Sequence, residues 1–283
     1  MSSMTYLKEM MPTLSPVEQR IAAYFLAHEE ALVTTPILTV AQACDTSKSA
    51  VVRLCKRVGY NGYKDFLTSL SAELAVLSHM GSADYSDIYP DSSVKSICTI
   101  VTQHAGHALD NTLRLMDMEA MERAVTVLTS ARRIDLYGLA NSGIIAQDAE
   151  LKFQRIGYNA HCALDGHRQA ICAATLAPGD AVMLFSYYGE TRDLLEVLDI
   201  AKERGATTIA VTRVGKNSLS TRADIVLSVA SMEKLSRSGA MTSRLVMLNM
   251  VDMLFTCISS RAYEQLRPTL ERTAKVIQAK RRG

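Results

Sequence analysis

Apolar side chains recur at helical spacing in the first part of the chain, between residues 15 and 77. One stripe contains Ile21, Tyr24 and Phe25. A second stripe consists of leucines three or four residues apart, Leu67, Leu70, Leu74 and Leu77. Apolar positions at this spacing predict amphipathic helices whose apolar faces pack together. The pattern therefore predicts an all-helical domain over residues 1–77.

The stretch that follows is polar. Residues 79–93 have the sequence HMGSADYSDIYPDSS, in which a glycine, a proline and several serines and aspartates favour turns over periodic structure. We therefore place a linker at residues 78–93, between the helical domain and a second domain over residues 94–283.

The second domain has a different pattern. Two helical segments, 94–117 and 118–130, precede short apolar runs that alternate with further helical segments. The runs are IDLYGLA from Ile134, NAHCAL from Asn159, AVMLFSY from Ala181, TTIAVT from Thr207 and DIVLSV from Asp224. Strands that alternate with helices of about 10–15 residues are typical of βαβ units, whose parallel sheet is covered on both faces. This predicts an α/β/α domain with a five-stranded, doubly wound parallel sheet, and two long helices after Ser238.

Composition and charge add little to this picture. The net charge of +2 over 283 residues is too small to indicate nucleic acid binding, so any such signal has to be local. Six cysteines are scattered without a CxxC pair, which argues against a zinc ribbon or a disulfide framework and favours a reducing cytoplasm. Lys8 and Glu9 interrupt the N-terminal segment, and Asp252 interrupts the apolar run 245–255. We therefore expect a cytoplasmic protein without a signal peptide or a membrane anchor.

The segment TVAQACDTSKSAVVRLCKRVGY has the spacing of a helix-turn-helix. Ala41, whose small side chain lets two helices cross closely, precedes Asp45 by four residues, and the aliphatic Val51 follows Asp45 by six. The turn position often needs a positive φ, which aspartate tolerates better than most residues. Ser47 is a natural N-cap for the second helix, so Lys48 would lie at the end of that helix that meets base edges.

Positive charge gathers on the second helix of this motif. No acidic residue occurs between Thr46 and Lys64. Lysine and arginine neutralise phosphates and release counterions, so we expect DNA binding that weakens steeply with salt. A basic helix can also be merely a solvent-exposed face, but the turn spacing, the serine cap and the acid-free window together favour DNA. The candidate DNA-contacting residues are Thr46, Ser47, Lys48, Ser49, Arg53, Lys56, Arg57 and Lys64. Cys44 and Cys55 are interpreted as small core residues rather than redox sensors.

Two loops of the second domain have the composition of an anion site. Strand IDLYG enters the loop GLANSG and strand AVMLFS enters the loop SYYGET, so both loops lie at the carboxyl ends of strands, where open α/β sheets bind ligands. Hydroxyls, glycines and the free N–H groups of a helix N-terminus together favour phosphate. Ser142 and Thr191 could instead serve only as N-caps. The candidate effector-binding residues of the loops are Gly138, Asn141, Ser142, Ser186, Tyr188, Gly189, Glu190 and Thr191.

Four other polar residues are less clear. Glu233, in the segment SMEKLSRSG, and His167, in LDGHRQ, could each contact sugar hydroxyls or lie exposed in a loop. His104 and His107 have helical i, i+3 spacing without an accompanying cluster of ligands, so we expect no metal site, and no cofactor is predicted.

Three segments follow one another along the chain: SAVVRLCKRVGYNGYKDF, then the loop GLANSG, then the loop FSYYGET. With these segments in this order, the sequence resembles the RpiR/MurR family of transcription regulators over nearly the whole chain. The resemblance implies a recognition helix with a wing-like continuation, from Gly59 to Phe66, that packs behind it. It implies that the second domain is a SIS (sugar isomerase) domain, a flavodoxin-like module that binds phosphosugars. It also implies a homodimer or homotetramer, which suits paired half-sites on a double-stranded DNA operator.

The resemblance assigns roles to individual positions. Ser142 matches the serine of the family's first loop, Ser186 and Thr191 match hydroxyl positions of its phosphate-binding second loop, and Glu233 matches an acid that often approaches the sugar.

Two positions depart from the family. Ala140 stands where the first loop usually has a second glycine, and Tyr188 stands where the second loop usually has a serine that contacts phosphate. The tyrosine ring fills volume and moves its hydroxyl outward, which leaves the identity of the effector open.

These observations predict a transcription regulator of carbohydrate metabolism whose DNA affinity is controlled by a phosphorylated sugar or sugar derivative. An aldose–ketose phosphosugar isomerase is an alternative, in which Glu233 or His167 would supply the general base. The basic recognition helix speaks against that activity, so we expect no enzyme. A ligand-independent DNA-binding protein, with the α/β domain as an oligomerisation scaffold, is the other alternative.

Overall fold

The computed structural model describes Met4, Leu7, Met10, Met11 and Ile88, together with residues 14–78, 91–231 and 240–281. The chain forms two compact units, Met1–His79 with Val214–Lys216, and Met80–Arg213 with Asn217–Gly283. Most of the predicted linker, residues 78–93, lies outside the described residues, and so does Glu233.

The N-terminal unit is helical, as its apolar stripes predict. Its described helices are α2 (Pro16–Ala27), α3 (Glu29–Leu32), α4 (Ile37–Ala43), α5 (Lys48–Arg57) and α6 (Tyr63–Ser78). A capping box starts α2, because the Ser15 side chain accepts from the backbone N–H of Glu18 while the Glu18 side chain accepts from that of Ser15. The core between the helices is aromatic: the Phe66 ring lies 5.0 Å from the Phe25 ring and 5.1 Å from the Tyr60 ring, centroid to centroid.

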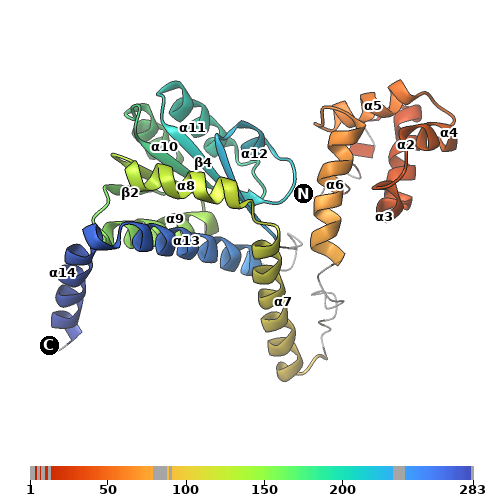
Figure 1. Ribbon diagram of the computed structural model, residues 1–283. Coiled ribbons are helices and arrows are strands. Elements are labelled where there is room, and N and C mark those ends of the chain that lie inside the picture. Colours follow the sequence, from red (N-terminus) through yellow and green to blue (C-terminus); the bar gives the residue numbers. More distant parts are fainter. Residues whose placement is uncertain are drawn as a thin grey trace. The chain divides into compact units, whose positions relative to one another are not determined.

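The second unit contains the predicted five-stranded parallel sheet (Figure 1). Its strands are β1 (Ile134–Gly138), β2 (Ala160–Ala163), β3 (Ala181–Phe185), β4 (Thr207–Arg213) and β5 (Ile225–Val229), in the order β2-β1-β3-β4-β5. Every residue of β1 and β3 is buried, as expected for central strands covered on both faces. The strand order reverses between β1 and β3, which is the place where doubly wound sheets bind ligands.

Helices cover both faces of the sheet (Figure 1). The helices of one face are α7 (Val94–Arg114), α8 (Met118–Ser130), α9 (Asn141–Arg155) and α13 (Met241–Arg261). Those of the other are α10 (Gly166–Ala174), α11 (Arg192–Glu203) and α12 (Ser218–Arg222), and α14 (Tyr263–Arg281) follows α13. Successive side chains of β1 enter the two cores in alternation, with Leu136 in the first and Tyr137 in the second.

The apolar character of α13 is explained by this packing. Within the described residues, it alone is long and apolar enough to cross a membrane by length and composition. Its apolar side chains Val246, Met250 and Leu254 are fully buried in the core between the helix and the sheet.

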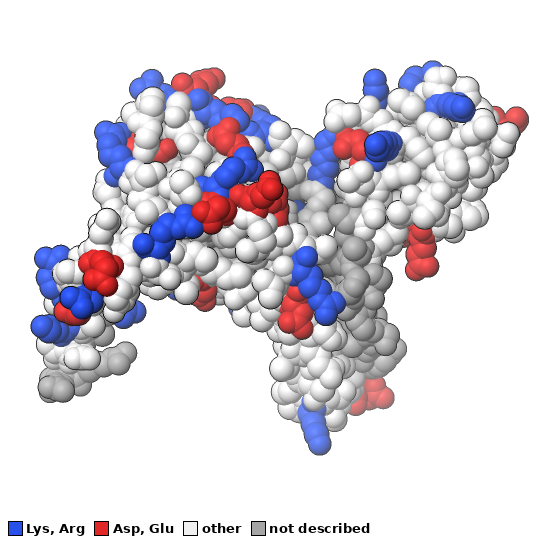
Figure 2. Space-filling model, in the orientation of Figure 1, with Lys and Arg blue, Asp and Glu red and all other residues white. Residues whose placement is uncertain are grey.

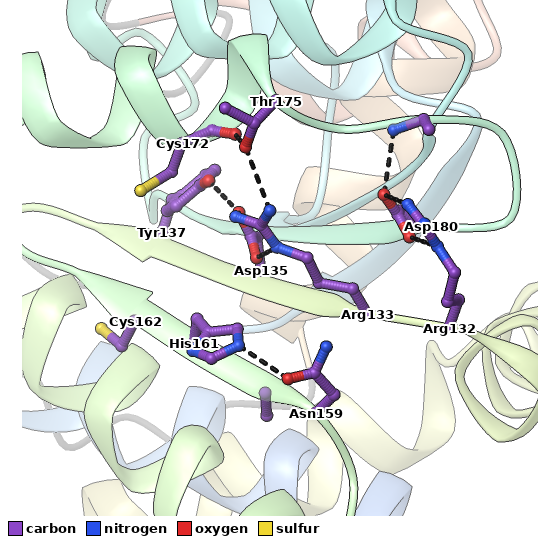
Figure 3. A network of polar contacts seen from close by, with 12 residues as sticks. Arg132, Arg133, Asp135, Tyr137, Asn159, His161, Cys162, Cys172, Thr175 and Asp180 are labelled. Atoms are coloured by element: carbon purple, nitrogen blue, oxygen red, sulfur yellow. Dashed lines mark hydrogen bonds and ion pairs between the residues drawn. The ribbon is translucent and has the colours of Figure 1, made fainter.

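A polar network lies at the amino-terminal end of β1 (Figure 3). Arg133 donates from Nε and Nη2 to the two carboxylate oxygens of the fully buried Asp135, both at 2.7 Å. Tyr137 also donates to this carboxylate. Burial, together with the charge of Asp135, raises the pKa of Tyr137 above its ordinary value, so the phenol keeps its proton and its role as a donor.

Candidate functional site

The turn between α4 and α5 has the geometry that the sequence predicts. Asp45 has a φ of 45°, in the left-handed region. The backbone N–H of Thr46 donates to the carbonyl of Ala41 at 2.8 Å, which closes the turn. Ala41 is 2% exposed and Val51 is fully buried, so the two helices pack closely through a small and an aliphatic side chain. These interactions form a helix-turn-helix.

Helix α5 has one buried and one charged face. Ser47 is its N-cap and accepts from the backbone N–H of Ala50 at 3.2 Å. Lys and Arg side chains lie on the solvent side of this helix (Figure 2). The exposed candidates are Ser47, Lys48, Ser49, Arg53, Lys56 and Arg57, with Lys64 exposed on α6 and Thr46 half-buried in the turn. The geometry thus presents a row of cations and hydroxyls that an anionic groove could accept.

The two cysteines of this motif face the core, as predicted. Cys55 is fully buried and Cys44 is 5% exposed. Burial raises the pKa of Cys55 to about 12, so its thiol is protonated and unreactive at neutral pH.

Residues 46–64 contain no acidic residue, but an acidic side chain of another helix lies beside them in the structure. Glu18, on α2, lies 2.8 Å from Nη1 of Arg57. Hydrogen bonds from Ser15, and then the charge of Arg57, hold the pKa of Glu18 below its ordinary value, so this carboxylate is ionised at neutral pH. Arg57 therefore has an anionic partner within the N-terminal unit, unlike the picture that the sequence alone suggested.

A further basic residue supports the turn and was missed by the sequence analysis. Arg20, on α2, donates from Nε to the carbonyl of Cys44 and from Nη2 to that of Asp45, both at 3.3 Å. These carbonyls follow the last turn of α4, so Arg20 ties α2 to the bend of the helix-turn-helix. No spacing rule links a residue of the preceding helix to this turn, and the sequence carried no signal for it.

The continuation from Gly59 to Phe66 packs against the recognition helix, as the resemblance implies, but it does not form a strand. Residues 59–66 form a turn followed by the first residues of α6, without a strand. Tyr60, Tyr63 and Phe66 are all buried in the helical core, which holds this segment against the other helices of the N-terminal unit.

The first candidate loop connects β1 to α9 very tightly. A side chain at Gly138 would place its Cβ 2.4 Å from the backbone oxygen of Ser142, so only glycine fits there. Ala140 occupies the N-cap position with φ 49° and ψ −122°, and no side-chain hydrogen bond caps the helix. Ser142 is thus not the N-cap that the sequence left open: it lies half-buried in the first turn of α9, next to Asn141.

The second candidate loop brings hydroxyls and a helix N-terminus together. Ser186, only 5% exposed, accepts at Oγ from the backbone N–H of Gly189 (3.2 Å) and lies 3.0 Å from Oγ1 of Thr191. Thr191 is the N-cap of α11, but its side chain makes no cap hydrogen bond. The first N–H groups of α11 are therefore not satisfied by their own N-cap side chain. Two hydroxyls beside such a helix start form a candidate cradle for an anion.

Neighbouring contacts fix the shape of this second loop. Gly189 has a φ of 70°, and a Cβ there would lie 1.9 Å from Oδ1 of Asn217. Glu190 accepts at Oε1 from the backbone N–H of Ser218 (2.9 Å) and at Oε2 from the Ser218 hydroxyl (2.6 Å), so its carboxylate caps α12. The ring of Tyr188 packs edge-on against that of Tyr187, with centroids 5.0 Å apart.

Among the remaining candidates, Glu233 lies outside the described residues. His167 is exposed on the first turn of α10, after β2. His104 is buried on α7, and no group of three or more His, Cys, Asp or Glu side chains in the described part of the chain is arranged to hold a metal ion.

Comparison with known proteins matches both units. Residues 1–76 match the model of the helix-turn-helix domain of the rpiR family, and residues 127–257 match that of the SIS domain. An uncharacterised HTH-type transcriptional regulator of Caldanaerobacter subterraneus subsp. tengcongensis is 33% identical, over 96% of this chain and 95% of its own. The uncharacterised HTH-type transcriptional regulator YbbH of Bacillus subtilis is 35% identical, over 97% of this chain and 96% of its own. The chain belongs to the RpiR family of transcriptional regulators.

A solved structure supports the same assignment for this RpiR-family protein. The NanR protein of Vibrio vulnificus, in complex with ManNAc-6P, is 26% identical, covers 98% of each chain and superposes with a TM-score of 0.66. Its ligand is a phosphosugar. The RpiR-family chain is accordingly a transcriptional regulator with a helix-turn-helix domain and a SIS domain.

Proposed function

We propose that this RpiR-family regulator binds operator DNA through the exposed face of α5, and that a phosphorylated sugar bound at the ends of β1 and β3 changes its affinity for that DNA. The second loop is the observation that carries the proposal. Ser186, Thr191 and the start of α11 gather hydroxyl and N–H donors in one place. Donors at a helix N-terminus suit a phosphate better than any neutral group.

The phosphate would bind by replacing contacts that the loop now makes within itself. The Ser186 and Thr191 hydroxyls lie within hydrogen-bond distance of each other. Each could turn its proton toward a phosphate oxygen, and the helix dipole would favour the negative charge. The sugar would then extend toward the first loop, where Asn141 and Ser142 begin α9. The similarity to the ManNAc-6P complex of NanR supports this class of ligand.

Regulation needs only a modest coupling between the two sites. A coupling free energy of about 1–3 kcal/mol would change DNA affinity by about 5- to 150-fold. Such a change requires that the sugar phosphate bind more tightly to one arrangement of the protein than to the other.

Loss of the Ser186 hydroxyl tests the effector site. Thermal shift and calorimetry with hexose 6-phosphates, including ManNAc-6-phosphate, should show stabilisation of the wild-type protein by a bound ligand. In Ser186→Ala the affinity should fall by about tenfold or more, because a donor to a charged group is lost, while ligand-free DNA binding stays unchanged.

Ser130→Ala is the matched control, since that hydroxyl on α8 donates to carbonyls of its own helix. It should bind the ligand as the wild type does. Unchanged affinity in Ser186→Ala would place the effector elsewhere, and conversion of a sugar phosphate during the assay would instead establish isomerase activity.

The salt dependence of DNA binding tests the recognition helix. Arg53 is exposed on α5, whereas Arg57 is paired with Glu18. Arg53→Ala should weaken operator binding and reduce the slope of log affinity against log salt by about one unit, the value for one lost phosphate contact. Arg57→Ala should change the slope less, because its guanidinium already has an anionic partner. Equal slopes for the wild type and Arg53→Ala, measured by fluorescence anisotropy, would contradict the proposed interface.

A further inference from the structure

Gln169 lies fully buried on α10, beside the first candidate loop. Its side-chain Nε2 donates to the carbonyl of Gly138 at 3.0 Å and to that of Ala163 at 2.7 Å. Gly138 is the last residue of β1 and Ala163 is the last residue of β2. The amide therefore lies at the carboxyl edge of the sheet, and both of its N–H groups are engaged.

The oxygen of the same amide is a buried acceptor. Oε1 of Gln169 is shielded from solvent and has no hydrogen-bond partner in the described structure. Exchange of Oε1 and Nε2 does not resolve this, because an oxygen would then face two carbonyl oxygens. Unpaired buried acceptors are unfavourable and rare, so this one needs a donor from outside the fold.

The register of the sheet places this acceptor near the phosphate cradle. Gly138 is the register partner of Phe185 across β1 and β3, and Ser186 directly follows Phe185. Adjacent strands lie about 4.8 Å apart. The amide of Gln169 is bonded to both Gly138 and Ala163, so it lies between the carboxyl ends of β1 and β2, one to two strand spacings from the end of β3 that carries Ser186. One sugar phosphate can bridge this separation.

We propose that Gln169 recognises the sugar part of the effector, by accepting at Oε1 a hydrogen bond from a ligand hydroxyl or amide N–H. This rests on the proposed function, because it takes a phosphate in the second loop as the fixed point. An acceptor does not bind an ionised phosphate oxygen. Gln169 therefore selects for sugar phosphates that carry a donor at this position, against inorganic phosphate and against analogues without that donor.

The test compares two ligand classes on matched variants. Gln169→Met removes the acceptor at similar volume. Gln154→Met is the control, since Gln154 also donates from Nε2 to a carbonyl of β2, that of Ala160, at 3.0 Å and at the other end of the strand. Calorimetry would use inorganic phosphate and a panel of ManNAc-6-phosphate, glucosamine 6-phosphate, glucose 6-phosphate and fructose 6-phosphate.

In Gln169→Met we expect the best sugar phosphate of the panel to lose about tenfold or more in affinity, while inorganic phosphate binds as it does to the wild type. Gln154→Met should retain both affinities. A sugar phosphate that depends on Ser186 but binds Gln169→Met as tightly as the wild type overturns this inference alone. Failure of every panel member to bind the wild type overturns the proposed function as well.

A second measurement keeps the test decisive if Gln169→Met does not fold, since that variant also loses the bonds to Gly138 and Ala163. Deoxy analogues of the best ligand, each lacking one hydroxyl, would be titrated into the wild-type protein. One analogue should lose about tenfold in affinity. Equal affinity for all analogues and the parent overturns the inference.

Discussion

The two loops at the centre of the sheet both turn through a residue with positive φ, but they use different residues for it. Each leads from a buried central strand into a helix, and each contains a residue with positive φ, Ala140 in the first loop and Gly189 in the second. Glycine adopts this conformation without steric cost, whereas alanine does so only under strain. The second loop, which has glycine at its positive-φ position, is also held by the contacts of Ser186 and Glu190.

This difference separates two kinds of constraint. At Gly189 both the backbone angle and a neighbour exclude a side chain, because Asn217 occupies the space of a Cβ. At Ala140 the angle alone is unfavourable, and the methyl group is exposed. Both the backbone angle and Asn217 exclude a side chain at position 189, so we expect substitution of Gly189 to destabilise the protein. At position 140 only the backbone is strained, so replacing Ala140 with glycine should stabilise the protein.

The largest effect is expected for Gly189→Ala. The new Cβ would lie 1.9 Å from Oδ1 of Asn217, and the φ of 70° would add strain. We expect a loss of about 3 kcal/mol in the free energy of unfolding, measured by urea denaturation. Stabilisation by a sugar phosphate should be lost with it, because the second loop has to move.

Gly179→Ala provides the control for backbone strain alone. Its φ is 89°, and a Cβ added there would meet no atom within 4 Å. This variant should lose only about 1 kcal/mol. Similar losses for the two variants would show that the contact with Asn217 does not constrain the second loop.

The contrast also indicates what a sequence can reveal about such a protein. The five strands were predictable because buried parallel strands are continuous apolar runs, and β1 starts at Ile134, as expected. The left-handed Asp45 and the N-cap Ser47 were predictable because their roles depend on neighbours along the chain. The hydroxyls of the second loop lie five residues apart and also meet in the structure.

Contacts between distant segments were not predictable in this way. The ion pair of Arg57 with Glu18 spans 39 residues, and the bond of Gln169 to Gly138 spans 31. The fold of residues 60–66 depends on distant segments in the same way, since their aromatic side chains pack into a core built by other helices. Tertiary packing decides these features, and no local spacing encodes it.

The smallest effect is expected for Ala140→Gly, which should stabilise the protein. Relief of the strained backbone at φ 49° should exceed the greater chain entropy of glycine in the unfolded state, for a net gain of about 1 kcal/mol. Ala131→Gly is the matched control, because Ala131 has an ordinary φ of −64° after α8 and should lose stability on the same substitution. Urea denaturation of both variants would measure whether each substitution raises or lowers the free energy of unfolding. A loss of stability in Ala140→Gly would mean that contacts of the methyl group outweigh the strain, and that this departure from the family's glycine is a stabilising feature of the first loop.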